Sequence, residues 1–115
     1  MEDDTHEVDR VFHALGDPTR RKILKMLSVR PHSVKGLADP LGITLTAVAQ
    51  QLRLLEASGL VRTEKLGRVR TCRLEPSGLD VAQVWLGECR TSWQHKLDRL
   101  AEYLDLGEDE DGPPQ

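Results

Sequence analysis

Amide and guanidinium side chains that could read nucleic-acid bases stand close together in the stretch ITLTAVAQQLRLLEASGLV, residues 43–61. Gln50 and Gln51 each offer a hydrogen-bond donor and an acceptor on one amide group, the combination that pairs with an adenine edge. Arg53 carries a fork of donors that suits guanine or a phosphate. The chemistry available in this stretch is therefore hydrogen bonding to base edges and to a phosphate backbone.

The spacing of apolar residues predicts that this stretch is a two-faced helix over about residues 45–57. Its predicted core face holds Val48, Leu52 and Leu55, with Leu45 beside them early in the helix. Its predicted exposed face holds Thr46, Gln50 and Arg53. Thr44 can cap the start of the helix, where hydroxyls and unpaired backbone N–H groups can meet phosphate or base edges, and Gly59 ends it.

The positive charge of the chain is concentrated around this helix. Although the formal net charge is −3, residues 18–73 hold twelve Lys and Arg against three acids. Such a basic middle between acidic ends predicts a surface that faces a polyanion, the alternative being an ordinary solvated surface. The twelve cations are Arg20, Arg21, Lys22, Lys25, Arg30, Lys35, Arg53, Arg62, Lys65, Arg68, Arg70 and Arg73.

Three further helices are predicted before the helix at residues 45–57. The first covers residues 5–15 and stops at Gly16; the second follows an N-cap at Asp17 and has Pro18 at its first position. Ser33 is placed to cap a short third helix, which Pro40 and Gly42 should end. A short helix, a tight turn and a second helix over residues 33–58 form the layout of a helix-turn-helix.

The sequence LVRTEKLGRVRTCRL predicts a two-stranded hairpin over residues 61–74, centred on Gly67. Its outward positions are mostly cationic, which favours the wing of a winged helix over a plain hairpin. Ser33, Lys35, Arg68 and Arg70 are expected to hold a nucleic-acid backbone, which sets the register of binding rather than its sequence.

A long helix with an apolar stripe is predicted over residues 77–104. Helices of this kind pair with a second copy or with the first helix of a partner subunit, the alternative being a cap over the chain's own core. The predicted homodimer interface consists of Val8, Val11, Phe12, Trp85, Cys89, Trp93, Leu97, Leu100 and Leu104. We expect one domain over residues 1–107, and a disordered acidic tail over 108–115.

Three segments together resemble the ArsR/SmtB family of bacterial repressors: VFHALGDPTRRKILKMLS, GITLTAVAQQLRLLEASGLV and the hairpin RTEKLGRVRTCRL. The resemblance covers about residues 8–104. It implies a mainly α fold with a small β-hairpin, a winged helix-turn-helix that dimerises through its terminal helices. It also implies that two recognition helices, here residues 45–57, enter successive major grooves of a pseudo-palindromic operator. Leu45, which is also a candidate DNA-contacting residue, and Ala49 stand where the family commonly has polar residues, which removes hydroxyl contacts.

The metal sites of the resembled family are absent from this sequence. One family site uses cysteines in the first helix of the helix-turn-helix, but the segment VKGLADPLG holds no cysteine or histidine. Another uses an aspartate and a histidine two residues apart on the C-terminal helix; here Ala82 stands two residues after Asp80, and the only histidine of that helix is His95. His6, Asp9 and His13 fall on one face of the first helix and could bind nickel or zinc with ligands from a partner, the alternative being a solvated face. We expect no cofactor, and we interpret Cys72 and Cys89 as ordinary thiols.

These features favour a sequence-specific DNA-binding transcriptional regulator, most simply a repressor that binds an inverted repeat of double-stranded DNA as a homodimer. Two alternatives stay open: a metal-responsive sensor with a non-standard site, and a winged-helix interaction module that acts through a partner protein. No arrangement of catalytic residues is present, so an enzyme is not expected. The sequence has neither a signal peptide nor a membrane span, which favours the cytoplasm. The sequence does not identify a small-molecule effector.

Overall fold

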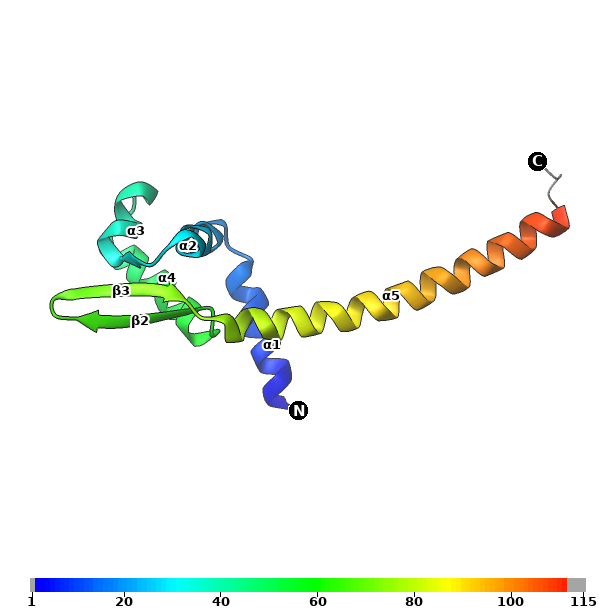
Figure 1. The fold of residues 1–115 in the computed structure, drawn as a ribbon, viewed down its shortest axis with the longest axis horizontal. Coiled ribbons are helices and arrows are strands. Elements are labelled where there is room, and N and C mark those ends of the chain that lie inside the picture. The colour runs from blue at the N-terminus through cyan, green and yellow to red at the C-terminus, as the bar shows by residue number, and fades with distance from the viewer. Residues whose placement is uncertain (1, 112–115) are drawn as a thin grey trace. The chain divides into compact units, whose positions relative to one another are not determined.

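The computed structural model describes residues 2–111, and the side chains of residues 6–105. In chain order these residues form α1 (Glu2–Leu15), α2 (Pro18–Val29), β1 (His32–Ser33), α3 (Val34–Leu41), α4 (Leu45–Ala57), β2 (Val61–Leu66), β3 (Val69–Leu74) and α5 (Pro76–Asp111) (Figure 1). The chain divides into two units, residues 1–83 and 84–115, where the sequence predicted one domain over 1–107. None of the described helices is both long and apolar enough to span a membrane.

Three of the helices begin at the side-chain caps that the sequence predicts. Asp17 Oδ2 accepts from the backbone N of Arg20 at 3.0 Å, and Pro18 opens α2. Ser33 Oγ accepts from Gly36 N at 2.9 Å, and Thr44 Oγ1 accepts from Ala47 N at 3.0 Å. Each cap satisfies one of the backbone N–H groups that the first turn of a helix leaves without a partner. The first helix begins at residue 2, three residues earlier than expected.

The helix ends differ in part from the prediction. Pro40 lies inside α3 rather than ending it, and the helix stops one residue later, before Gly42, whose φ is 68°. At the end of α4, Gly59 has a φ of 74°, as predicted for a terminating glycine. The N–H of Leu60 donates to Leu55 O at 2.9 Å across this turn, which fixes where β2 starts.

The predicted hairpin is present, and a third strand joins it. Strands β2 and β3 are antiparallel and connected by the two residues Gly67 and Arg68, with Gly67 at a φ of 64°. Glycine tolerates this φ because it has no Cβ. His32 and Ser33, for which the sequence pattern predicts no strand, form β1 and pair with β3, so the strand order is β1-β3-β2.

The core of the first unit lies between helices α1 to α4 and one face of this sheet. Its fully buried side chains are Ile23, Leu37, Leu55, Leu60, Val11, Val48 and Cys72. Two predictions are wrong here. Leu45 is 54% exposed instead of lying beside the core, because it occupies the first position of α4. Val11, expected in a dimer interface, is 1% exposed because α1 packs it into the chain's own core. Val8 and Phe12 are partly buried.

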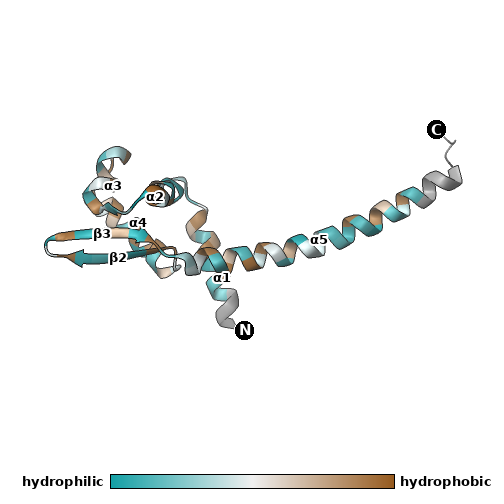
Figure 2. Cartoon of the chain, viewed as in Figure 1, coloured by the Kyte–Doolittle hydropathy of each residue, from teal (hydrophilic) through white to brown (hydrophobic). Residues whose placement is uncertain are grey.

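Most of α5 lies in the second unit, where the coloured part of the helix alternates apolar and polar residues and carries the predicted apolar stripe (Figure 2). Five of its large side chains are 50 to 68% exposed: Leu86, Trp93, Leu97, Leu100 and Leu104. Cys89 is half-buried, and Trp85 is 42% exposed. The helix continues through Asp111, four residues into the segment 108–115 that the sequence predicted to be a disordered acidic tail. Residues 112–115 lie outside the described part of the chain.

Candidate nucleic-acid interface

The second helix of the helix-turn-helix presents a polar face, as predicted. Val48, Leu52 and Leu55 are buried, whereas Thr46, Gln50 and Arg53 are exposed on the other side of α4. Leu45 is exposed at the start of the helix. The core face fixes the rotation of α4 about its axis, and so decides which side chains point outward.

The two helix caps lie at the start of α3 and α4 and retain hydrogen-bonding capacity. Ser33 and Thr44 each use a hydroxyl oxygen to accept from a backbone N–H of their own helix. A hydroxyl that accepts in this way still carries a proton to donate, for example to a phosphate oxygen. Thr44 is exposed and Ser33 is partly buried, and Lys35 is exposed in the first turn of α3.

Gln51 is placed differently from its neighbour Gln50. Its side chain is only partly exposed, and its Oε1 accepts a hydrogen bond from Arg20 Nη1 at 2.9 Å. Arg20 itself is 8% exposed, so it does not belong to the charged surface on which the sequence placed it. The acceptor of the Gln51 amide is therefore directed into the protein. The sequence gives no signal for this pairing, because the two residues lie 31 positions apart.

The five wing cations divide between the two faces of the hairpin. Residues directly opposite in an antiparallel pair share a face, and Lys65 pairs with Arg70 on the same face as Val61 and buried Cys72. On the other face Arg62 pairs with Arg73. Arg68 is exposed in the turn between the strands.

Acidic side chains lie beside the cations of the outer face. Arg62 lies 4.0 Å from Glu64 and 3.8 Å from Glu75, and Arg73 lies 3.8 Å from Glu64. Within the described residues, neither Lys65 nor Arg70 has a carboxylate oxygen within 4.0 Å. Among the described residues, the face of the wing that points toward the helices is thus the one whose cations, Lys65 and Arg70, form no ion pair within 4.0 Å.

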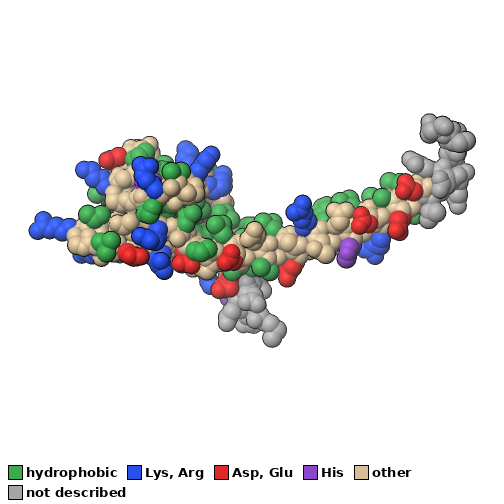
Figure 3. Space-filling model, viewed as in Figure 1, with side chains coloured by type: hydrophobic (Ala, Val, Ile, Leu, Met, Phe, Trp, Pro, Cys, Tyr) green, Lys and Arg blue, Asp and Glu red, His purple; other side chains and the backbone are tan. Residues whose placement is uncertain are grey.

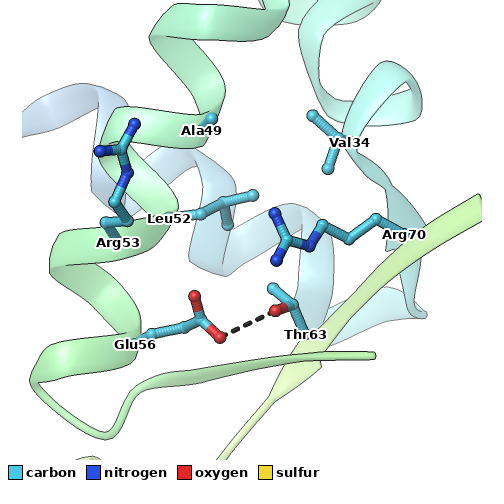
Figure 4. A pocket seen from close by; sticks show the side chains of 7 residues that line it. All are labelled: Val34, Ala49, Leu52, Arg53, Glu56, Thr63 and Arg70. Atoms are coloured by element: carbon cyan, nitrogen blue, oxygen red, sulfur yellow. Dashed lines mark hydrogen bonds between the residues drawn. The ribbon is translucent and has the colours of Figure 1, made fainter. Parts of the chain in front are cut away.

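A pocket of about 260 Å³ joins this face of the wing to α4 (Figure 4). It is lined by Val34, Ala49, Leu52, Arg53, Glu56, Thr63 and Arg70. The guanidinium groups of Arg53 and Arg70 therefore border the same hollow from two elements. Thr63 Oγ1 donates to Glu56 Oε2 at 2.8 Å, a contact that joins α4 to β2. Neither residue was predicted from the sequence as part of the site, although Glu56 is the only acid in residues 45–57.

Lys and Arg side chains gather over the wing and the neighbouring helices (Figure 3). Four of the twelve predicted cations have partners inside the protein: Arg20, Arg21, Arg62 and Arg73. The other eight are exposed, with no carboxylate oxygen within 4.0 Å in the described part of the chain. They are Lys22, Lys25, Arg30, Lys35, Arg53, Lys65, Arg68 and Arg70.

The metal site considered on α1 is not formed by the side chains of one chain. Among residues 6–105, no three His, Cys, Asp or Glu side chains are grouped so that they could hold an ion. His6, Asp9 and His13 therefore do not form an ion site within one chain, and a site completed by ligands from a partner stays a prediction. Burial raises the pKa of the Cys72 thiol from 9.0 to about 11, helped by the charge of Glu56, so it is not a thiolate at neutral pH.

Comparison with known proteins agrees with this geometry. Residues 15–64 match a helix-turn-helix domain family. The HTH-type transcriptional regulator Rv2034 of Mycobacterium tuberculosis is 34% identical over 97 residues, which cover 84% of this chain and 88% of that protein. The structure of an ArsR-like transcriptional regulator from Rhodococcus sp. RHA1 is similar with a TM-score of 0.79 and 30% identity, over 91% of this chain and 96% of that one.

A second solved structure bears on assembly. It is the homodimeric winged helix-turn-helix DNA-binding domain Mb0332 from Mycobacterium bovis, described as a possible ArsR-family transcriptional regulator. Its TM-score is 0.61 at 28% identity, over 79% of this chain and 82% of that one. The similarity extends beyond the helix-turn-helix itself, since these matches cover most of each chain.

Proposed function

Because this chain belongs to the ArsR/SmtB family of winged helix-turn-helix transcriptional regulators, we propose that it is a repressor that binds an inverted-repeat operator as a homodimer. In this role the protein occludes a promoter. A regulator of this kind acts where the DNA is, which in a bacterium is the cytoplasm.

The observation that carries this proposal is the convergence of Arg53 and Arg70 on one pocket. One residue comes from the exposed face of α4 and the other from the inner face of the wing. A helix lying in a major groove and a wing beside it would then meet one continuous stretch of duplex. A protein-interaction module would not need eight exposed cations without acidic partners.

The proposed contacts fall into two classes. Gln50 and Arg53 read base edges, with Thr46 near them on the same face, and exposed Leu45 offers an apolar contact to a thymine methyl group. The backbone-holding residues are Ser33, Lys35, Thr44, Arg68 and Arg70. These contacts set orientation, whereas the first class supplies sequence preference.

The dimer is proposed to form through the apolar stripe of α5, with Val8 and Phe12 of α1 contributing. Large exposed apolar faces on a short chain mark an interaction surface. The homodimeric state stated for Mb0332 supports a homodimer here. In a two-fold dimer the two copies of α4 would meet half-sites about one helical turn apart.

In vitro selection from random duplexes tests this function, using the full chain without added metal at about 150 mM salt, since phosphate contacts alone dominate at low salt. Enrichment of an inverted repeat with half-sites about one helical turn apart is the expected result. Affinity for that site should fall by about three to five decades between 50 and 200 mM salt if 6–10 phosphates are contacted. Absence of any enriched sequence would contradict the proposal and favour action through a partner protein.

A further inference from the structure

The guanidinium of Arg20 joins three helices of the first unit. Arg20 extends from the first turn of α2 and is 8% exposed. Its Nε donates to Ala14 O at 2.8 Å and its Nη2 to His13 O at 3.1 Å, both at the end of α1. Its Nη1 donates to Gln51 Oε1 on α4 at 2.9 Å. One planar group thus ties the end of α1 to the middle of α4.

The end of α1 is a favourable place for a buried cation. The last carbonyl groups of a helix lack intrahelical partners and carry partial negative charge. Arg20 bonds to two of them, and Arg21 Nη1 donates to the next, Leu15 O, at 2.7 Å. The carbonyl contacts fix the plane of the Arg20 guanidinium, so the direction of its third hydrogen bond is fixed as well.

The position of Gln51 follows from that direction. Its amide oxygen has to meet a donor that the end of α1 holds in place, and the residue is partly buried. Gln50, one residue earlier, is exposed. The apolar core face sets the rotation of α4, and the charge-assisted hydrogen bond to Arg20 adds a restraint with a defined direction.

We infer that Gln51 is a positioning residue, which through Arg20 locks the rotation of the recognition helix α4 to α1, while its neighbour Gln50 reads bases. This inference rests on the proposed function, since it concerns how α4 is presented to DNA.

Two substitutions of Gln51 separate positioning from reading. Gln51→Glu keeps an acceptor oxygen for Arg20 but removes the amide donor that an adenine edge requires. Gln51→Met keeps the size of the side chain and removes the acceptor. We expect Q51E to select the same operator as the parent protein, and Q51M to lose at least about tenfold in operator affinity, as for a lost hydrogen bond to a charged group.

Gln50→Glu is the matched control on the same helix. It should alter the preferred base at one position of each half-site. If Q51E alters the selected sequence as Q50E does, then Gln51 reads bases and the inference is overturned. It is overturned equally if Q51M binds the operator with the affinity of the parent protein.

Unfolding measurements keep this inference separate from the proposed function. If the parent protein selects no DNA sequence, this result overturns the proposed function but does not decide whether Gln51 and Arg20 position α4. A double-mutant cycle of Arg20→Lys and Gln51→Met, read by chemical denaturation, then tests the link alone. Coupling between the two changes supports the lock; additive effects would overturn it. Should R20K fail to fold, hydrogen exchange of the α1 amides in Q51M decides instead. Faster exchange than in the parent protein supports the lock, and equal exchange overturns it.

Discussion

Thr63 Oγ1 donates a hydrogen bond to Glu56 Oε2 at 2.8 Å, and this contact joins the last turn of α4 to β2. It is a direct side-chain bond between the proposed recognition helix and the wing (Figure 4). On either side of it lie Arg53 and Arg70, which line the same pocket. The bond is therefore placed to hold the two elements that we propose to face DNA at a fixed separation.

Replacing Thr63 by valine should misalign the wing. Thr63→Val keeps the shape of the side chain but removes the donor, and an ordinary hydrogen bond contributes about 0.5–1.5 kcal/mol. Operator affinity should then fall about three- to tenfold. Thr63→Ser keeps the hydroxyl and should restore most of the affinity, as fluorescence anisotropy with labelled operator can measure. Equal losses in T63V and T63S would show that the bond does not align the wing.

The two faces of the wing should differ in their effect on salt dependence. Removing Lys65 or Arg70 by alanine substitution should lower the slope of log affinity against log salt by about 0.9 for each phosphate that the variant no longer neutralises. Arg62→Ala is the control, because Arg62 lies on the other face beside Glu64 and Glu75. Its slope should equal that of the parent, and its stability should change by no more than about 1 kcal/mol.

Lys65→Ala should also stabilise the fold slightly, since it removes a like charge directly opposite Arg70. A drop in slope for R62A as large as that for R70A would contradict the division of the wing into two faces.

Local features of this fold were predictable from the sequence. The caps at Asp17, Ser33 and Thr44 each bond to a backbone N–H three residues away, so the residue types alone identify them. The buried face of α4 follows from periodicity. Contacts between distant segments were not predictable in this way. Nothing local connects Arg20 with Gln51, and a two-residue strand such as β1 has no periodicity to detect.

Periodicity also does not identify the surface against which an apolar stripe packs. Val11 and Leu97 both belong to helical stripes, yet Val11 is buried inside this chain and Leu97 is 50% exposed. The number of neighbours available within the chain decides between these outcomes, and that number depends on the tertiary fold. This is why the sequence assigned Val11 to a dimer interface and the structure does not.

Cys72 should make stability depend on alkaline pH. Its folded pKa of about 11 lies above the ordinary 9.0, because burial disfavours the thiolate. The folded state therefore binds the proton more tightly, and this contribution is complete below pH 9.0 and lost as the pH rises toward 11. Urea denaturation across this range should show a decline in the parent protein that Cys72→Val lacks. An identical decline in both proteins would assign the effect to other groups.

Gly78 should tolerate no side chain. A Cβ there would lie 2.6 Å from Ser58 O, in backbone that cannot move aside without shifting the end of α4. Gly78→Ala should therefore destabilise the protein by more than about 1 kcal/mol, despite the higher helix propensity of alanine. Gly87→Ala, also in α5 but with nothing within 4 Å, should instead stabilise by about 0.5–1 kcal/mol. Thermal unfolding of both variants compares the two positions, and stabilisation by G78A would contradict the close approach.

The exposed stripe of α5 should be the dimer contact. Leu97→Lys places a charge within the stripe, next to Trp93, which is 68% exposed. His95→Lys is the matched control, since it lies about 160° around the helix from Leu97 at 3.6 residues per turn. Sedimentation velocity should find L97K monomeric and H95K dimeric. Because a monomer engages one half-site at a time, L97K should also lose at least about a hundredfold in affinity for the inverted repeat, as expected when the two half-sites are no longer bound together. A dimeric L97K would place the interface elsewhere, and Val8 and Phe12 on α1 would then be the next positions to substitute.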